Sequence, residues 1–173
     1  MVKKAFVFLW ETVKIVIVSL AIIIPIRYFL IQPFFVRGAS MMPNFDNGEY
    51  LVINEINYRF ESPQRGQVII FKYPLNPSQY YIKRIVGLPG ETVEIKDSRV
   101  FVQGAALDES VYLPEGRVTL GNLKVELGQE EYFVLGDNRS ASSDSRQWGI
   151  LPRENIIGFV WIRAWPFDAF EVF

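Results

Sequence analysis

The sequence predicts a mainly β domain, an antiparallel sandwich or barrel, attached to one amino-terminal transmembrane helix. Two observations predict this fold. The first 30 residues or so are almost entirely apolar, whereas the rest of the 173-residue chain alternates short apolar runs with turn sequences. Half of the residues are hydrophobic and 15% are aromatic, which favours a packed core over disorder. We therefore expect a cytoplasmic tip and membrane anchor over residues 1–30 and one extracytoplasmic β domain over 31–173.

The composition excludes several kinds of site. The 18 basic and 19 acidic residues nearly cancel, so nothing favours nucleic acid as a partner. The chain has no cysteine and no histidine, which excludes a Ser-His-Asp triad, a cysteine nucleophile and nearly every zinc site. No run of acidic residues has calcium-loop spacing. We expect no metal and no cofactor, so any catalysis must use Lys, Asp, Glu, Tyr or Ser.

The amino-terminal segment is apolar around all faces of a helix. Its only charges between residues 5 and 36 are Glu11, Lys14 and Arg27. The uncharged residues between Lys14 and Arg27 span about 18 Å as a helix, less than the hydrocarbon core of about 30 Å. The flanking charges must therefore snorkel, or Glu11 and Lys14 must pair one helical turn apart.

Three interpretations of this segment remain open. A retained anchor fits best. A cleaved export signal requires a small-residue cleavage site, which the following IRYFLIQPFFV lacks. A helix of a soluble domain is usually apolar along one stripe, whereas this segment is apolar on all faces, which disfavours a buried helix of a soluble protein. Lys3 and Lys4 place the amino terminus in the cytoplasm by the positive-inside rule.

The rest of the chain is rich in short segments with β-forming residues. Turn sequences such as YPLNPS, GLPGE and LPEGR separate them, and we expect an inserted hairpin over residues 97–131. Without intervening helices, this spacing indicates antiparallel pairing. The expected strand segments are EYLVINEI, GQVIIFKY, QYYIKRIVGL, ETVEIK, SRVFVQG, EEYFVLG and NIIGFVWIRAW.

A serine and a lysine are the candidate reactive pair. Ser40 lies in RGASMMPNF, a setting that can present a reactive hydroxyl. In a strand through YYIKRIV, Lys83 shares a face with Tyr81 and Ile85, among apolar neighbours. A desolvated lysine whose pKa falls from about 10.4 to about 7.5, a change of about 4 kcal/mol, can act as a general base. The alternative is a lysine that snorkels from a solvated strand face.

A third polar segment, GDNRSASSDSRQWG, covers residues 136–149. By itself it is typical of a surface turn. Its hydroxyls can also orient a lysine amine, as the third member of a triad orients the base.

Together these segments resemble the bacterial type I signal peptidases, which remove signal peptides from exported preproteins with a serine nucleophile and a lysine base. The resemblance covers the anchor and most of residues 30–166. The motifs that carry it are QPFFVRGASMMP, YYIKRIVGLPGE, GDNRSASSDSRQWG and GFVWIRAWPF.

The resemblance implies roles for individual residues. Ser40 matches the nucleophile, Lys83 the general base, and Ser142 the hydroxyl that holds the lysine amine. The Ser40 N–H would be one oxyanion donor. Many members have a serine at the position of Gly38, whose hydroxyl is a second donor, so a backbone group or water must serve here. The resemblance also implies charge pairs around the site, formed by Arg84, Asp137, Asp144 and Arg146.

Two departures from the family pattern predict weaker supporting hydrogen bonds. Asn44 replaces a usual threonine, and Ser140-Ala141 replaces a common Asp-Asn. They also leave open an inactive, membrane-tethered β scaffold or binding module of the same fold. A self-cleaving, repressor-like Ser/Lys protease is a further alternative, but it requires a DNA-binding module where this chain has an apolar segment.

The implied partners are signal peptides and the phospholipid bilayer, at the extracytoplasmic side of a bacterial cytoplasmic membrane. The resemblance implies small substrate residues one and three positions before the cut. An extended peptide can add as a strand beside the segments before Ser40 and Lys83. Met41, Met42 and Phe45 are candidates for an apolar rim on lipid. Candidate wall residues of the pockets are Phe34, Val36, Tyr81 and Ile82.

Overall fold

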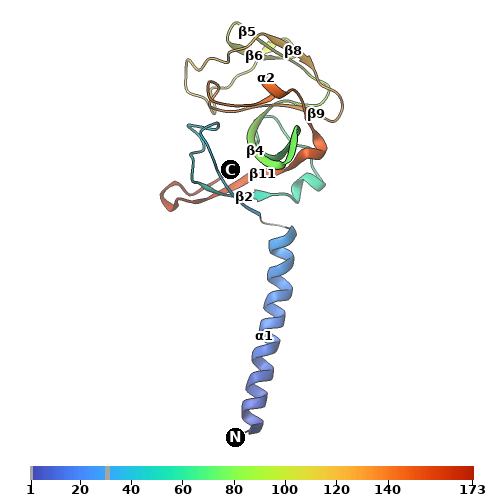
Figure 1. Cartoon of the computed structure of the whole chain (residues 1–173), viewed down its shortest axis with the longest axis vertical. Coiled ribbons are helices and arrows are strands. Elements are labelled where there is room, and N and C mark those ends of the chain that lie inside the picture. The colour runs from blue at the N-terminus through green and yellow to red at the C-terminus, as the bar shows by residue number, and fades with distance from the viewer. Residues whose placement is uncertain (1, 30–31) are drawn as a thin grey trace.

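The computed structural model describes residues 2–29 and 32–173. Helix α1 (Val2–Phe29) extends away from a β domain that contains the other elements (Figure 1). Within these residues, no helix combines the length and apolar composition needed to cross a membrane. Lys14 Nζ donates to Glu11 Oε1 at 2.8 Å, so the expected pairing one turn apart is formed. The expected boundary between residues 30 and 31 falls outside the described residues.

The larger sheet, sheet A, is antiparallel throughout, and the prediction of a mainly antiparallel β domain is confirmed. Apolar β-branched and aromatic residues dominate its central strands, as expected for strands with a buried face. The strand order is β1 (Gln32–Phe35), β2 (Tyr50–Asn54), β11 (Ile156–Trp165), β3 (Val68–Tyr73), β4 (Asn76–Gly87), β9 (Glu131–Leu135) and β10 (Leu151–Pro152), with β12 (Glu171–Val172) beside β11.

Sheet B is small and covers one end of the domain (Figure 1). It starts at Thr92, before the hairpin expected over 97–131, because the alternating apolar residues Val93 and Ile95 pair their strand with sheet B. Its order is β7 (Ala105–Ala106), β6 (Arg99–Val102), β5 (Thr92–Lys96) and β8 (Leu123–Glu126). The short helical elements are η1 (Asn57–Arg59), α2 (Ser145–Trp148), η2 (Arg153–Asn155) and η3 (Phe167–Ala169).

Apolar packing joins the two sheets where β4 ends. One buried cluster combines Val86 and Phe133 of sheet A with Val93 and Ile95 of sheet B. Gly87 permits this approach, since a Cβ at that position would lie 2.4 Å from Val93 Cγ2. Burial of these side chains therefore fixes sheet B over the end of β4.

The turn after β1 is part of the core. Met41 and Phe45 are both 1% exposed and pack with Leu51 and Ile53, while Met42 is 40% exposed. The expectation that all three form an outer apolar rim is therefore wrong for Met41 and Phe45. Their burial ties the turn that carries Ser40 to the sheet.

Replacement of Phe133 tests the packing between the sheets. Phe133 is 0% exposed, so Phe133→Ala is expected to lower the free energy of unfolding by about 3–5 kcal/mol. Phe60→Ala is the matched control, because Phe60 is 83% exposed and its loss should change the free energy by less than about 0.5 kcal/mol. Urea unfolding of both variants measures the difference, and equal effects would contradict the assigned packing.

Candidate active site

Lys83 lies in the middle of β4, where it pairs with Ile69 of β3. Its neighbours along the strand are apolar, and only 4% of the residue is exposed. Burial lowers the pKa of the Lys83 amine from 10.5 to about 8, against the opposing effects of Asp144 and Asp137. The structure thus places Lys83 in the buried, apolar setting expected from the sequence.

Ser40 lies in the turn that follows β1, and hydrogen bonds hold the turn on both sides. The Asn138 N–H donates to the Ser40 carbonyl at 3.0 Å, and Asn138 Nδ2 donates to the Ala39 carbonyl at 3.0 Å. The Gly38 N–H donates to Asn47 Oδ1 at 2.9 Å. Gly38 has φ +88°, a conformation that strains any residue with a side chain. Hydrogen bonds to the backbone groups of residues 38–40 therefore hold the turn in place.

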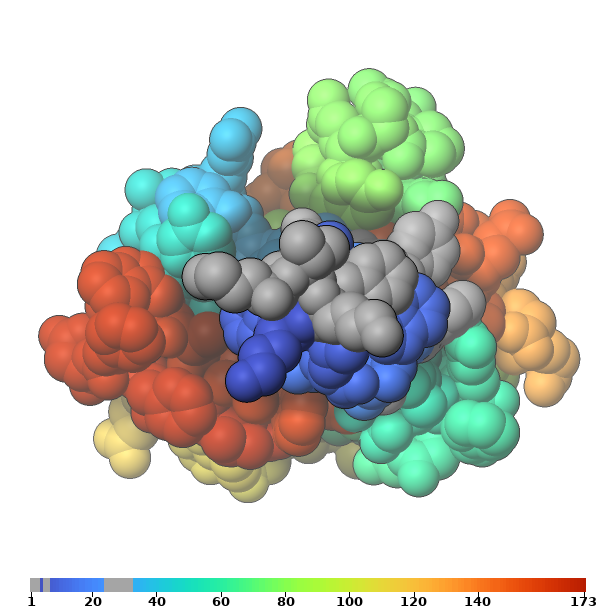
Figure 2. Space-filling view, turned by 90° about the horizontal axis from the view of Figure 1, so that it is seen from below, coloured from blue at the N-terminus to red at the C-terminus, as the bar shows by residue number. Residues whose placement is uncertain are grey.

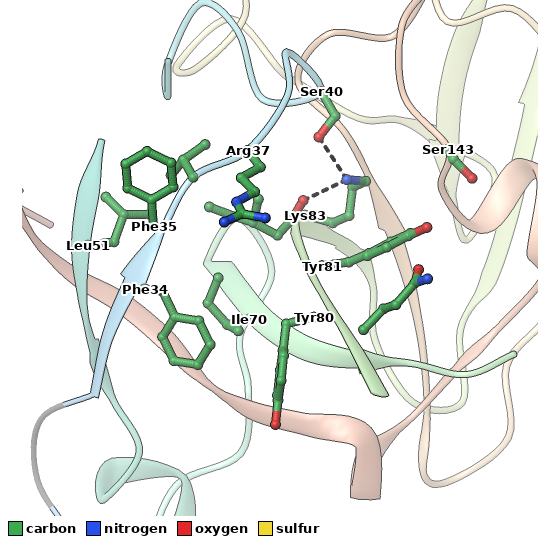
Figure 3. A pocket seen from close by; sticks show the side chains of 13 residues that line it. Phe34, Phe35, Arg37, Ser40, Leu51, Ile70, Tyr80, Tyr81, Lys83 and Ser143 are labelled. Carbon is green, nitrogen blue, oxygen red and sulfur yellow. Dashed lines mark hydrogen bonds between the residues drawn. The ribbon is translucent and has the colours of Figure 1, made fainter. Parts of the chain in front are cut away.

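The lysine amine reaches the serine hydroxyl across this turn. Lys83 Nζ donates to Ser40 Oγ at 2.9 Å and to the Ile82 carbonyl at 2.7 Å (Figure 3). The ring of Tyr81 lies 5.4 Å from Nζ. No carboxylate of the described chain forms an ion pair with this amine. The distance meets the geometric requirement for proton transfer between the two groups.

Ser142 is close to this pair but does not hold the amine in this structure. Its Oγ is buried and has no hydrogen-bond partner within the described residues. The expected hydrogen bond to Lys83 is thus absent here. Gly136 lies directly against Ser142 and the backbone of Ser40. A Cβ at Gly136 would be 2.2 Å from Ser142 Oγ and 2.5 Å from the Ser40 carbonyl oxygen.

Arg84, which follows Lys83 on β4, forms a buried ion pair with Asp137. Arg84 Nε and Nη2 donate to the two carboxylate oxygens of Asp137 at 2.8 and 2.6 Å. Asn44 Nδ2 donates to Asp137 Oδ2 at 2.7 Å and to the Tyr112 carbonyl at 2.6 Å. Asn44, which stands where the family usually has threonine, therefore supports the site with two hydrogen bonds.

The second pair, Asp144 and Arg146, shapes the segment that packs on Ser40. Arg146 Nε and Nη2 each donate to Asp144 at 2.8 Å. Asp144 also caps helix α2 and accepts from the Gly136 N–H at 3.1 Å. Ser140 Oγ donates to Asn138 Oδ1 at 3.1 Å. These contacts give residues 136–146 one defined path.

Some residues that support the site were not predicted from the sequence. The side chain of Arg139 is buried and bonds Glu109 and Thr119, which come from the connection between β7 and β8. Asn138 was within the quoted motif and could have been singled out as a turn residue. Asn47 and Glu109 lie outside the motifs, so only the folded chain reveals their contacts.

A cleft of about 510 Å³ opens beside Ser40 and Lys83 (Figure 3). All four predicted wall residues line it, from the segments before Ser40 and before Lys83. Strand β1 pairs only with β2, and β9 pairs with β4 only from Arg84 onward, so two strand edges face the cleft in the described chain. The lining residues are Phe34, Phe35, Val36, Arg37, Ser40, Leu51, Ile70, Gln79, Tyr80, Tyr81, Ile82, Lys83 and Ser143.

Comparison with known proteins agrees with this geometry. The profile of the family described as "Signal peptidase, peptidase S26" matches residues 9–165. "Probable signal peptidase I-1" of Synechocystis sp. is 36% identical over 166 residues, which cover 92% of this chain and 84% of that protein. "Signal peptidase IB" of Staphylococcus aureus is 32% identical over 180 residues, which cover 94% and 93%.

A solved structure is similar as well. The crystal structure of a signal peptidase I from Enterococcus faecalis V583 superposes with a TM-score of 0.50 at 31% identity, covering 58% of this chain and 97% of that chain. Sequence and structure therefore agree that the chain belongs to the signal peptidase family, peptidase S26.

Proposed function

We propose that this protein is a membrane-bound serine endopeptidase that removes signal peptides from exported preproteins. The observation that carries the proposal is the 2.9 Å contact between the Ser40 hydroxyl and the buried amine of Lys83. A general base works best when its pKa is near the ambient pH, and a lysine pKa of about 8 meets that condition. The family relationship supports the same chemistry.

In the first half of the reaction, neutral Lys83 accepts the Ser40 proton while Oγ attacks the scissile carbonyl carbon. The oxyanion accepts a hydrogen bond from the Ser40 N–H, which donates to no other acceptor among the described residues. The Lys83 ammonium then protonates the leaving amine, and the peptide bond breaks. The product is an acyl-enzyme on Ser40 and a released mature protein.

In the second half, Lys83 accepts a proton from a water molecule that attacks the acyl carbonyl. Collapse of this intermediate returns the proton to Ser40 Oγ and releases the signal peptide. Rotation of the unpaired Ser142 hydroxyl toward the amine would hold Lys83 in position during both halves. The Gly38 N–H is bonded to Asn47 in this structure, so a second oxyanion donor requires that bond to open or a water to serve.

The substrate strand would lie between the free edges of β1 and β4. Main-chain hydrogen bonds to these edges would fix its register, and alternate side chains would enter the apolar cleft. Phe34 and Tyr80 narrow the cleft with ring centroids 5.7 Å apart. A cleft narrowed in this way and lined largely by apolar residues favours small side chains near the scissile bond.

Membrane attachment through α1 is part of the proposal, with the catalytic domain on the extracytoplasmic side of a bacterial cytoplasmic membrane. The helix exposes large apolar side chains from Val7 to Ile23, and its inner charges Glu11 and Lys14 are paired. Figure 2 shows the face from which α1 projects, bordered by the segment after β1, the β3–β4 turn and the last strands.

Aromatic side chains of β1, β2, β11 and η3 are exposed in a row. Phe35 packs on Tyr50 with centroids 5.0 Å apart, Tyr50 pairs with Trp165, and Trp165 packs on Phe167 at 4.7 Å. All four are at least 46% exposed. Aromatic side chains favour the membrane interface, so this row supports a site held close to the lipid surface.

Replacement of either member of the reactive pair tests the catalytic proposal. Ser40→Ala should abolish cleavage of a preprotein, and Lys83→Met should lower kcat by about 10²- to 10⁴-fold because the base is lost while its apolar stem remains. Lys124→Met is the control, since Lys124 is exposed on β8 in sheet B. Near-normal turnover by Lys83→Met would identify a different base, and an inactive wild-type protein would indicate a scaffold of the same fold.

New charges within α1 test the membrane attachment. Ile17→Lys with Leu20→Lys should release the full chain from lipid vesicles into alkaline carbonate, because each charge costs about 2.5–3.5 kcal/mol in a bilayer centre. Val111→Lys is the control, since Val111 is 88% exposed on the β domain. The attachment would be wrong if the wild-type chain itself were extracted by carbonate.

A further inference from the structure

Arg37 brings a positive charge into the cleft. It follows β1 and directly precedes the turn Gly38-Ala39-Ser40. Its side chain lines the cleft, and Figure 3 shows the guanidinium extending inward between the strand that carries Phe35 and the side chain of Lys83. The residue is exposed, so a bound peptide can reach it.

No acidic group of the described chain neutralises Arg37. Its side chain forms no hydrogen bond or ion pair with the described residues, and no carboxylate lines the cleft. Five other arginines of the β domain differ from it, because each has an acidic partner at 4.0 Å or less: Arg65, Arg84, Arg139, Arg146 and Arg163. The reacting form of Lys83 is neutral, so Arg37 supplies the full positive charge of the cleft lining.

We propose that Arg37 binds a carboxylate of the substrate and selects peptides with Asp or Glu shortly before the scissile bond. This inference rests on the proposed peptidase function and adds a specificity to it. A guanidinium donates two parallel hydrogen bonds to a carboxylate and keeps its charge at all working pH values.

The geometry of strand addition narrows the peptide position. Side chains of a bound strand alternate, so residues one and three before the cut face the apolar walls. Residues two and four before the cut point the other way, toward the rim. Arg37 is exposed, whereas the wall residue Val36 beside it is buried, so a carboxylate at one of these two outward-facing positions can reach the guanidinium.

Matched peptides that differ only in Glu against Gln test the inference. Each pair carries the change two or four residues before the cut, and the full-length protein is assayed in neutral detergent, where no lipid phosphate competes. The wild-type protein should cleave the Glu peptide with a kcat/KM about three- to fivefold higher at one of the positions, as expected for a partly exposed ion pair. The preference should decline in about 1 M salt, where the screening length is about 3 Å.

Variants of Arg37 assign the preference. Arg37→Gln should bring the ratio of Glu to Gln cleavage close to one, and Arg37→Glu should favour a peptide with Lys at the same position. Arg117→Gln is the matched control, because Arg117 is exposed in the connection between β7 and β8, outside the cleft lining. It should keep the wild-type ratio.

Three results would overturn the inference. The first is a wild-type protein with no preference at either position, and the second is a preference that survives in Arg37→Gln. The third is an equal loss of cleavage of both peptides in Arg37→Gln, which would mean that Arg37 contacts the main chain of the substrate or contributes to folding.

A binding measurement separates this inference from the proposed function. Ser40→Ala lacks the nucleophile but retains Arg37, so its affinity for the two fluorescently labelled peptides reports recognition alone. Tighter binding of the Glu peptide, with no cleavage by the wild-type protein, would uphold the specificity and refute the peptidase function. Cleavage without any preference for the Glu peptide would uphold the peptidase function and refute the specificity.

Discussion

The contact between a dehydrated amine and an alcohol is the interaction on which the rest of the site depends. An amine in water holds its proton far above neutral pH and cannot act as a base there. Strand β4 removes Lys83 from water, and the turn after β1 places Ser40 Oγ 2.9 Å from its nitrogen. Two acids in the neighbourhood oppose the effect of burial. Asp137 and Asp144 each accept two hydrogen bonds from an arginine, which keeps them from pairing with the amine.

The surrounding fold brings together three segments that are far apart in the sequence and holds them in fixed positions. Burial of Met41 and Phe45 fixes the turn of Ser40, and the ladder of sheet A fixes Lys83. The segment 136–146 completes the arrangement through the Asn138 N–H and the close approach of Gly136. Sheet B also supports the site. The long connection between its strands β7 and β8 carries Glu109 and Thr119, which accept hydrogen bonds from Arg139 in that segment. The inserted region thus acts as a support for the site.

Much of this arrangement follows from local sequence. Seven strands coincide with segments in which apolar β-formers lie between turn residues, as in QYYIKRIVGL and NIIGFVWIRAW. Strand β8 (LKVE) was not expected, because four residues with two charges carry no clear pattern and the strand forms only through pairing with β5. Strand β1 was also missed, because its apolar residues directly continue the apolar amino-terminal segment and no turn sequence separates the two.

The site residues divide in the same way. The Ser40–Lys83 contact and the four cleft walls could be predicted, because strand alternation and motif order constrain them. Asn47 and Glu109 could not, since their hydrogen bonds depend on loops that meet only in three dimensions. The resemblance predicts a hydrogen bond between the Ser142 hydroxyl and the amine, yet this hydroxyl, which lies close to Gly136, has no partner among the described residues.

The charge state of one nitrogen is therefore the quantity to measure. Carbon-13 NMR of the full-length protein with labelled lysine, with the Lys83 signal assigned by its loss in Lys83→Met, reports the titration of this amine directly. Burial lowers its pKa to about 8, so the signal should titrate with a midpoint near that pH and cleavage should increase with pH through the same range, as the neutral amine forms. A midpoint at the pKa of an ordinary exposed lysine, near about 10.4, would contradict the account.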